Sequence, residues 1–373
     1  DSYRDANTLT PEKMIKVQVL WQEIKTEANR LGFNHIGVAP ALPLPHIETF
    51  EAWIQSGRHA DMGYLSCPDT LAKRRNPRQI LEGCQRIICL AMPYRRPQAE
   101  IKPSPSGTGR ISNYARTQDY HERIWENLAQ LESFIESQAD HPVQLKSYVD
   151  TGPVLERSYA TQAGIGIAGK NSCLLIQGTG SYFFLAEILT DLELPASDPF
   201  TRDLCATCRR CIDACPTGCI REDHTLDAGR CISYLTIENR GLIPDDLKEK
   251  VGPWVFGCDV CQMVCPHNAW TRDQPYPLGE PLLPEFIDLI ALLQMEDDSF
   301  FESFSETPLS RAKRQGMLRN AAVVLGCQRC REALPILKRT LDRESDPAVQ
   351  DACRWAISQI NNTEEDYNEN HKQ

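Results

Sequence analysis

The chain has 373 residues, a formal net charge of −11 and 41% hydrophobic residues, enough for two or three domains with sizeable cores. No apolar run approaches the roughly 20 residues that a membrane-spanning helix needs, and the amino terminus shows no basic stretch followed by an apolar one, so we expect neither a membrane partner nor an export signal. The negative charge argues against a general nucleic-acid binder, and sixteen cysteines without an export signal predict metal-bound thiolates in a cytoplasmic, reducing compartment.

The first hundred residues predict an alternation of helices and strands. The stretch 11–31 is predicted to be an amphipathic helix with Thr10 as its N-cap, because apolar residues recur at spacings of three and four from Met14 to Leu31. The segment 71–77 is basic, and it predicts either a solvated loop or a clamp on an anionic ligand. Further elements are expected as a strand at 33–38, a helix at 47–56 and a buried strand at 86–92.

A strand end in the next hundred residues carries a candidate catalytic group. A loop is expected at 97–110, and His121 opens a helix to about residue 138, where we expect this histidine at the surface. The strand 144–149 then ends at Asp150, ahead of a Gly-Pro turn and a further helix. Catalytic carboxylates are often presented at strand ends, but Asp is also a good helix cap, so both roles remain open.

Residues 164–171 contain Gly-x-Gly-x-x-Gly followed by Lys170 and Asn171, a pattern close to phosphate-binding loops. Such a loop follows a strand and opens a helix, whereas here a helix precedes the glycines and the apolar run 173–176 follows. Asn171 also replaces the hydroxyl residue that would hold magnesium. The sequence therefore argues against an NTPase or a dinucleotide fold, and it predicts a turn whose backbone approaches a bulky ligand. Another strand of the same sheet is expected at 182–190.

The most specific pattern lies between residues 205 and 265. The first run spaces its cysteines by two, two and three residues before a proline, as in bacterial-type ferredoxins, whose fourth cysteine binds the other cluster. This spacing predicts two 4Fe–4S clusters with crossed ligation. Cluster one takes Cys205, Cys208, Cys211 and Cys265, and cluster two takes Cys215, Cys258, Cys261 and a fourth ligand. We favour Cys231 over Cys219 for that ligand. Zinc knuckles, which usually have longer gaps, and disulfides, which need an oxidising compartment, are the alternatives.

The chain after residue 275 is predicted to be helical. A proline-rich boundary at 275–284 precedes helices expected at 285–295, 315–325, 331–342 and 346–360, the last three similar to short α-solenoid repeats. The first repeat helix carries a basic cluster, which predicts either a solvated face or contacts to a phosphate backbone. Its members are Arg311, Lys313, Arg314 and Arg319. The polar, acidic tail 361–373 is expected to be disordered.

Together these motifs resemble the epoxyqueuosine reductase family, which is related to reductive dehalogenases. The resemblance covers nearly the whole chain and rests on the stretch from Asp150 to Ala160, on 163–172, on the cysteine set, on the segment near Ser112 and on the basic helix. It implies an α+β fold in three parts. These are an α/β cobalamin-binding catalytic domain with a mixed sheet at 1–197, a ferredoxin-like domain at 198–274, and HEAT-like helices at 275–360.

The resemblance implies an enzyme that uses cobalamin to remove the epoxide oxygen of epoxyqueuosine at the tRNA wobble position in a two-electron step. Asp150 would donate a proton, and the two clusters, with Cys231 completing the second, would feed electrons to the cobalamin. Position 124 is Ile where a histidine-binding cobalamin motif has Gly, so we expect base-off cobalamin without a histidine ligand. The implied cobalamin contacts are Lys73, Asn113, Tyr114, Asp150, Lys170, Asn171 and Ser172.

The implied partners are a tRNA carrying epoxyqueuosine, held by the basic helix, and an electron donor such as a flavodoxin or ferredoxin; the protein is expected to be a monomer. Two other functions remain open. A reductive dehalogenase would share the cofactors but normally carries a twin-arginine signal and a tyrosine acid, neither of which is apparent here. A ferredoxin-like electron carrier would need no large ligand pocket.

Overall fold

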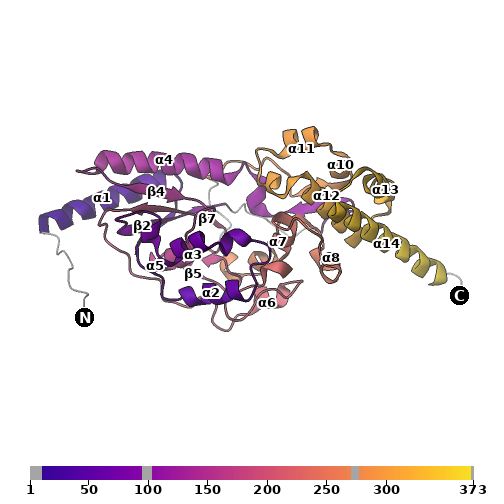
Figure 1. The fold of residues 1–373 in the computed structure, drawn as a ribbon, viewed down its shortest axis with the longest axis horizontal. Coiled ribbons are helices and arrows are strands. Elements are labelled where there is room, and N and C mark those ends of the chain that lie inside the picture. Colours follow the sequence, from indigo (N-terminus) through magenta and orange to yellow (C-terminus); the bar gives the residue numbers. More distant parts are fainter. Residues whose placement is uncertain (1–10, 95–102, 270–276, 371–373) are drawn as a thin grey trace.

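The computed structural model describes residues 11–94, 103–269 and 277–370, and for 363–370 it describes the backbone only. The molecule is elongated, with a sheet and its helices at one end and the C-terminal helices at the other (Figure 1). None of the helices in these ranges has the length and apolar composition that crossing a bilayer requires. The predicted N-cap at Thr10 lies outside the described residues.

A four-stranded antiparallel sheet forms the centre of the N-terminal part. Its strands follow the order β1 (His35–Pro40), β2 (Arg86–Pro93), β7 (Phe183–Thr190) and β4 (Leu145–Tyr148), close to the predicted strands. Successive side chains of β2 alternate between two cores: Ile88 and Leu90 pack on one face, Ile87 and Cys89 on the other. This alternation buries both faces of β2, which explains its continuous apolar run.

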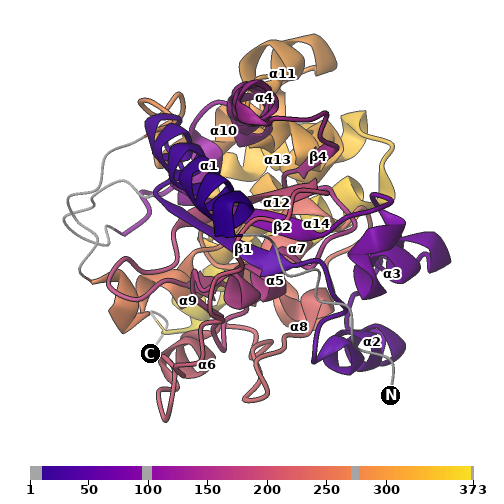
Figure 2. The same cartoon turned by 90° about the vertical axis from the view of Figure 1, so that its left-hand side faces the viewer.

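Helices cover both faces of this sheet (Figure 2). The helices α1 (Pro11–Arg30) and α4 (Tyr120–Gln138) pack against one face, and α5 (Glu156–Gln162) packs against the other. Met14 is 57% exposed, because the first turns of α1 extend past the core, so the buried stripe begins at Trp21 and not where predicted.

Two helices precede β2. The first, α2 (Ile47–Gln55), matches its prediction, whereas most of the basic segment 71–77 lies in α3 (Pro68–Arg75) and not in a loop. Pro68 starts α3 in its first turn, and Asp69 pairs with Lys73 one turn later at 2.7 Å. These local preferences favour a helix over the predicted loop.

A second, smaller sheet joins the sheet part to the rest of the molecule. Its central strand β3 (Thr108–Ile111) pairs in parallel with β8 (Trp254–Phe256) and antiparallel with β9 (Phe286–Asp288). The end of the predicted loop 97–110 is therefore a strand, and its first residues, 97–102, lie outside the described residues. The helix predicted at 285–295 begins as the strand β9, because these residues pair with β3, and the helix itself starts at Leu289.

The C-terminal helices share one core with part of the cysteine-rich segment. The cysteine-rich segment contributes α7 (Ile232–Ile237) and α8 (Asp245–Val251). The C-terminal helices are α10 (Leu289–Gln294), α11 (Asp297–Phe304), α12 (Lys313–Cys327), α13 (Leu334–Arg343) and α14 (Pro347–Asn370). Buried side chains from Ala228 through Phe256 to Ile360 belong to one continuous cluster. The hydrophobic core therefore does not divide at residue 275.

The last helix also corrects the predicted tail. The sequence predicts disorder for residues 361–373. The helix α14 instead continues to Asn370, so residues 361–370 are helical. No Gly or Pro interrupts the chain after Pro347, and extending an existing helix adds one hydrogen bond for each residue that it fixes. Residues 371–373 lie outside the described residues.

Candidate active site and metal centres

Four thiols line one pocket around the turn that precedes α6 (Arg210–Ala214). Cys205 and Cys208 come from this turn, Cys211 lies in the first turn of α6, and Cys265 follows the short helix α9 (Val260–Met263). The Cys265 thiol lies within electrostatic reach of the other three. The crossed set predicted for cluster one is therefore brought together in space.

Lys170 belongs to this first set of thiols. Its backbone N–H donates to Cys205 Sγ at 3.4 Å, and its Nζ donates to the carbonyl groups of Ala206 at 3.0 Å and Cys208 at 3.2 Å. Glu222 pairs with the same Nζ at 3.2 Å. An ammonium group has three donors, and all three are used here. Lys170 therefore has no side-chain donor left for cobalamin, contrary to the sequence prediction.

The second set of thiols gathers around Cys215. Cys215 Sγ lies 3.5 Å from Cys219 Sγ, and the Cys219 thiol also contacts that of Cys231. The thiols of Cys258 and Cys261 lie within electrostatic reach of Cys231. The structure thus brings together the set predicted for cluster two, and both candidates for its fourth ligand lie beside it.

A sixth thiol near the second set was not predicted. Cys173 contacts Cys261 and lies beside the hairpin of β5 (Ile167–Ala168) and β6 (Leu174–Leu175). Across the described part of the chain, no three His, Cys, Asp or Glu side chains converge as a single metal ion would require. This spread of thiols suits a larger group better than the single ion of a zinc knuckle.

The glycine-rich turn 164–169 serves the packing of this hairpin. A Cβ atom on Gly166 would lie 2.3 Å from the carbonyl oxygen of Leu175, and one on Gly169 would lie 2.7 Å from the Leu175 side chain. Both positions therefore require glycine for contacts within the protein. The predicted approach to a ligand is not needed to explain them.

Asp150 follows β4 on a tight turn and lies among polar side chains. Its φ of 56° places it in the left-handed region, and a Cβ on Gly152 would lie 2.4 Å from the ring of Tyr148. Its Oδ2 accepts a hydrogen bond from the Tyr120 hydroxyl at 2.8 Å. Its backbone N–H donates to Glu156 Oε1 at 2.7 Å. The side chain is 48% exposed, so a ligand has access to it.

Tyr120 and His121 open α4 directly beside Asp150. The Tyr120 ring stacks on Phe184 at 4.0 Å, and burial together with the charge of Asp150 raises the pKa of Tyr120, so the phenol keeps its proton. His121 Nε2 lies 3.7 Å from Asp150 Oδ2, and Asp119 holds the other ring nitrogen at 2.7 Å. His121, expected at the surface, is partly exposed with its side chain 21% accessible, and it lies beside Asp150 because α4 starts there.

Arg311, predicted to contact nucleic acid, points at the same carboxylate. Its Nη1 lies 3.6 Å from Asp150 Oδ2, and its Nε pairs with Glu238 Oε1 at 2.6 Å. Arg311 comes from the 3-10 helix Pro308–Ala312, which precedes α12. Sequence reasoning gave no signal for this contact, since the partners come from separate parts of the chain.

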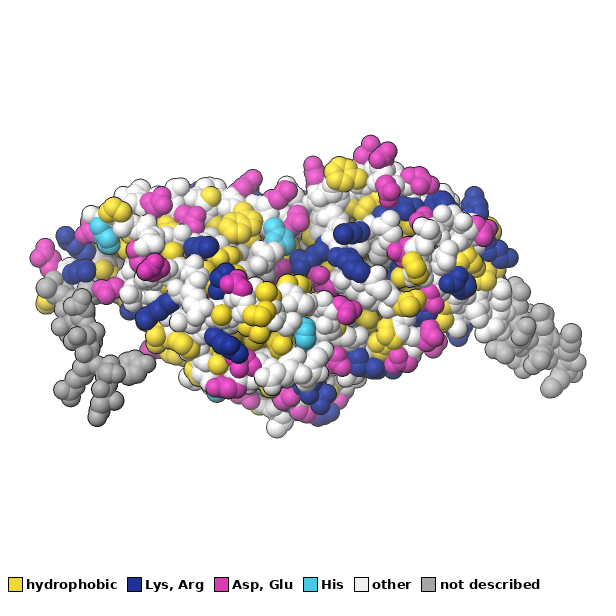
Figure 3. Space-filling model, viewed as in Figure 1, with side chains coloured by type: hydrophobic (Ala, Val, Ile, Leu, Met, Phe, Trp, Pro, Cys, Tyr) yellow, Lys and Arg dark blue, Asp and Glu magenta, His cyan; other side chains and the backbone are white. Residues whose placement is uncertain are grey.

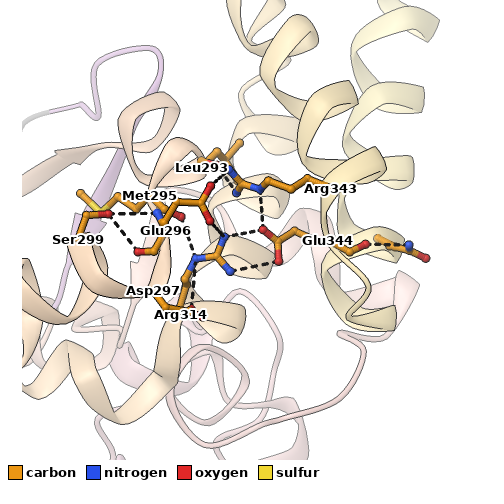
Figure 4. A network of polar contacts seen from close by, with 9 residues as sticks. Leu293, Met295, Glu296, Asp297, Ser299, Arg314, Arg343 and Glu344 are labelled. Atoms are coloured by element: carbon orange, nitrogen blue, oxygen red, sulfur yellow. Dashed lines mark hydrogen bonds and ion pairs between the residues drawn. The ribbon is translucent and has the colours of Figure 1, made fainter.

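Two of the predicted nucleic-acid contacts are buried and internally paired, and the prediction is wrong for them. Arg314 is 7% exposed; its guanidinium donates to the Met295 carbonyl at 2.8 Å and pairs with Glu344 at 2.5 Å (Figure 4). Arg319 is 2% exposed and donates to the carbonyl groups of Leu235, Asn239 and Gly241. These guanidinium groups satisfy main-chain oxygens inside the protein, so neither reaches a phosphate.

Lys313 alone of the four is exposed. On the face drawn in Figure 3, Lys and Arg side chains gather where the sheet part meets the C-terminal helices. Lys313 therefore stays a candidate for contact with an anionic partner.

The remaining predicted ligand contacts are spread over several segments. The backbone N–H of Asn113 donates to Asp259 Oδ2 at 2.8 Å, and Tyr114 lies 6.1 Å from Tyr120, ring centroid to centroid. Lys73 pairs with Asp69, as described above. Ser172, at a φ of 60°, donates from its hydroxyl to the carbonyl of His224 at 3.3 Å.

Three buried polar atoms in these segments lack a hydrogen-bond partner: Arg74 Nη1, His121 Nε2 and Asn171 Nδ2. Buried polar groups are normally satisfied, so such orphans call for a partner. They come from three segments that include or adjoin the predicted cobalamin contacts. Unpaired polar atoms of this kind suit a ligand rich in polar groups, such as cobalamin, although Asn171 also lines the pocket of the first thiol set.

Two family profiles match the chain. The profile described as "4Fe-4S double cluster binding domain" matches residues 204–268, and the one described as "Epoxyqueuosine reductase QueG, DUF1730" matches residues 74–151. The first covers both cysteine runs, and the second ends just after Asp150.

Curated relatives named epoxyqueuosine reductase match most of the chain. The protein of Cyclobacterium marinum is 38% identical over 80% of this chain and 94% of its own, and that of Pseudomonas aeruginosa is 35% identical over 91% and 94%. The Escherichia coli protein is 34% identical over 91% of this chain and 89% of its own.

Two solved structures resemble the whole fold. An epoxyqueuosine reductase with an epoxyqueuosine-modified stem loop of tRNA-Tyr superposes with a TM-score of 0.81 at 32% identity, covering 92% of this chain and 91% of the other. The Bacillus subtilis epoxyqueuosine reductase, with its aspartate catalytic loop swung out of the active site, gives a TM-score of 0.82 at 30% identity over the same shares.

Proposed function

The chain belongs to the epoxyqueuosine reductase family, and from this premise we propose how its own residues carry out the reaction. It is an oxidoreductase of tRNA modification, which removes the epoxide oxygen of epoxyqueuosine by two-electron reduction to give queuosine. The double-cluster segment serves electron transfer. The roles of individual residues, given next, are proposals.

We assign Cys205, Cys208, Cys211 and Cys265 to cluster one, and Cys215, Cys231, Cys258 and Cys261 to cluster two. The choice of Cys231 over Cys219 rests on the 3.5 Å between the Cys215 and Cys219 sulfur atoms. Each iron of a cube takes one thiolate, so a thiol this close to a ligand is better placed to donate a hydrogen bond to it. The Lys170 N–H supports cluster one in the same way.

We assign cobalamin to these segments, in the base-off state and without a histidine ligand. Its contacts would come from Lys73, from the loop of Asn113 and Tyr114, and from Asn171 and Ser172. When bound, it supplies the electrons or the nucleophile that the side chains of this protein lack. The motif of proteins that bind cobalamin through histidine has Gly at the position of Ile124. In this protein Ile124 is a fully buried core residue of α4, so the position serves packing.

We propose that Asp150 donates a proton to the epoxide oxygen, which leaves poorly as an alkoxide. Three features support this role: the partly exposed carboxyl, its strained turn, and the hydrogen bond from Tyr120 that fixes its orientation. The related Bacillus subtilis enzyme also carries an aspartate on its catalytic loop. The partly exposed carboxylate that accepts the Tyr120 hydroxyl is the observation that carries the proposal.

We further propose that residues 1–197 hold the cobalamin, that 198–274 hold the clusters, and that the HEAT-like helices α12 to α14 present Lys313 to the tRNA. Phosphates of an anticodon loop would meet this lysine, and an unpaired wobble base can splay into a pocket. A flavodoxin or ferredoxin would donate the electrons to a monomeric, cytoplasmic enzyme.

The test uses protein reconstituted anaerobically with iron, sulfide and cobalamin, and an RNA stem loop that carries epoxyqueuosine. We expect queuosine by mass spectrometry. The Asp150→Asn variant should lose about 100- to 10,000-fold in turnover while it keeps both clusters and the cobalamin. Wild-type turnover in this variant would remove Asp150 from the mechanism, and absence of turnover in the wild-type protein would overturn the proposed function.

A further inference from the structure

The reaction needs more protons than Asp150 holds. Both carbon–oxygen bonds of the epoxide break, a carbon–carbon double bond forms, and the oxygen leaves as water. This change consumes two electrons, which an external flavodoxin or ferredoxin supplies through the clusters, and two protons. One carboxyl group delivers one proton before it must be recharged, so a second acid has to serve the site.

Glu156 is the carboxyl group bonded to the catalytic turn. It opens α5, and its Oε1 accepts the backbone N–H of Asp150 at 2.7 Å. Its carboxyl group therefore lies against the same turn that carries the proposed acid. An ionised Glu156 that accepts this hydrogen bond positions the turn. A protonated Glu156 can accept the same hydrogen bond through its carbonyl oxygen, and it then also holds a proton.

The charges that face Glu156 come from four directions. Arg74 of α3 and the adjacent Arg157 favour its carboxylate form, whereas Asp150 and Glu187 of β7 oppose it. Burial is the largest cause, the charge of Asp150 adds to it, and against the backbone hydrogen bond and the two arginines they raise the pKa of Glu156 to about 8. Glu156 therefore keeps its proton near neutral pH.

Glu187 extends the row of carboxyl groups into the sheet. It is 1% exposed, and its carboxyl group faces that of Glu156. It lies opposite Cys89 of β2 and Tyr148 of β4 in the sheet register. Burial, then the charges of Glu156 and Asp150, raise the pKa of Glu187 well above its usual range.

We propose that Glu156, backed by Glu187, holds the second proton of the reaction and returns it to Asp150 after the first transfer. The row runs from the 48% exposed Asp150 to the interior of the sheet, and this inference rests on the proposed role of Asp150. Glu156 acts through Asp150, so it is a proton-holding and positioning residue and not a catalytic one.

The test is the Glu156→Gln variant of the reconstituted holoenzyme. The Gln amide oxygen still accepts the Asp150 N–H, so the substitution keeps the positioning bond and removes only the proton. In single turnover with the epoxyqueuosine stem loop, the wild-type rate should fall as pH rises through about 8, where Glu156 loses its proton. The variant should be about 100-fold slower and lack this alkaline decline.

Glu132→Gln is the matched control, because Glu132 also accepts a side-chain hydrogen bond at the sheet, from Ser147, but lies outside the row. It should keep wild-type rates. Infrared spectra provide a readout independent of turnover: the band of a protonated carboxyl group should weaken in Glu156→Gln and in Glu187→Gln. An unchanged rate, pH profile and band in Glu156→Gln would overturn the inference. Absence of turnover in the wild-type protein would instead overturn the proposed function.

Discussion

Replacing Tyr120 by Phe tests how Asp150 is held. The substitution removes one hydroxyl group, which donates to Asp150 Oδ2 at 2.8 Å. The ring itself should stay in place, because it stacks on Phe184 at 4.0 Å with an interplanar angle of 11°. Phe fills the same volume in that stack. The variant therefore changes one hydrogen bond to a charged group and little else.

The size of the expected effect follows from the contacts of Asp150 Oδ2 with Tyr120 and Arg311, since its third neighbour, His121, stays the same in both variants. A hydrogen bond to a charged group contributes about 1.5–3 kcal/mol, which corresponds to about 10- to 150-fold in rate if it serves only to orient the acid. The Arg311 pair is 3.6 Å long, and the two side chains are 37% and 48% exposed. Such a pair is worth about 0.2–1 kcal/mol, or at most about 5-fold. Tyr120 should therefore outweigh Arg311.

The assay is single turnover of the epoxyqueuosine stem loop by reconstituted protein. We expect the maximal single-turnover rate to fall in Tyr120→Phe while the enzyme concentration that gives half of that rate, the iron content and the cobalamin content stay the same. Arg311→Met serves as the matched variant on the other side of the carboxylate. A larger loss in Arg311→Met than in Tyr120→Phe, or a wild-type rate in the latter, would refute the reasoning.

Other predictions concern the helices and the second cluster. Arg314→Met should lower the free energy of unfolding by about 3 kcal/mol in a urea titration, the low end for a broken buried pair, because Arg343 still pairs with Glu344 at 2.9 Å; unchanged stability would contradict the burial of this pair. Burial acts to raise the pKa of Glu344, but Arg314 lowers it and prevails. The stability from this pair is therefore present above the unfolded pKa of Glu344 and is lost as pH falls through the lower folded pKa. The free energies of unfolding of wild type and Arg314→Met should converge in acid. Lys313→Glu should weaken binding of the RNA stem loop and flatten its salt dependence without a change in stability, whereas equal affinity at every salt concentration would place the RNA elsewhere. Cys219→Ser should keep about eight irons and Cys231→Ser should keep about four; the reverse result would exchange their roles.

The cysteine spacing was the most informative part of the sequence, for a physical reason. Cys205 and Cys208 lie on one turn and Cys211 at the start of the helix that follows it, so local geometry alone brings them together. Only Cys265, the ligand from the second run, is distant in sequence. It could be predicted because the second run repeats the last two spacings of the first and also ends in Cys-Pro. Spacing could not choose between Cys231 and Cys219, because both lie in the long segment that joins the two runs.

The arginines show the opposite case. Arg319 was predicted at the surface because charged residues rarely lie in a core. In the structure it donates to three main-chain carbonyl groups of the segment 235–241, which no short-range pattern encodes. A helix face that is basic in sequence can therefore be an internal hydrogen-bonding surface, and only its packing partners distinguish the two.

The position of Arg311 joins three parts of the chain at the proposed acid. Glu238 follows α7 in the cysteine-rich segment, Arg311 precedes α12, and Asp150 follows β4 of the sheet. Because α7 and α12 share one core, Arg311 and Glu238 are held by the same packed unit, and that unit touches the Asp150 carboxylate through Arg311. The orientation of Asp150 therefore depends on how this unit docks against the sheet, so substitutions that loosen the C-terminal helices should reduce turnover even where they contact neither cofactor nor RNA.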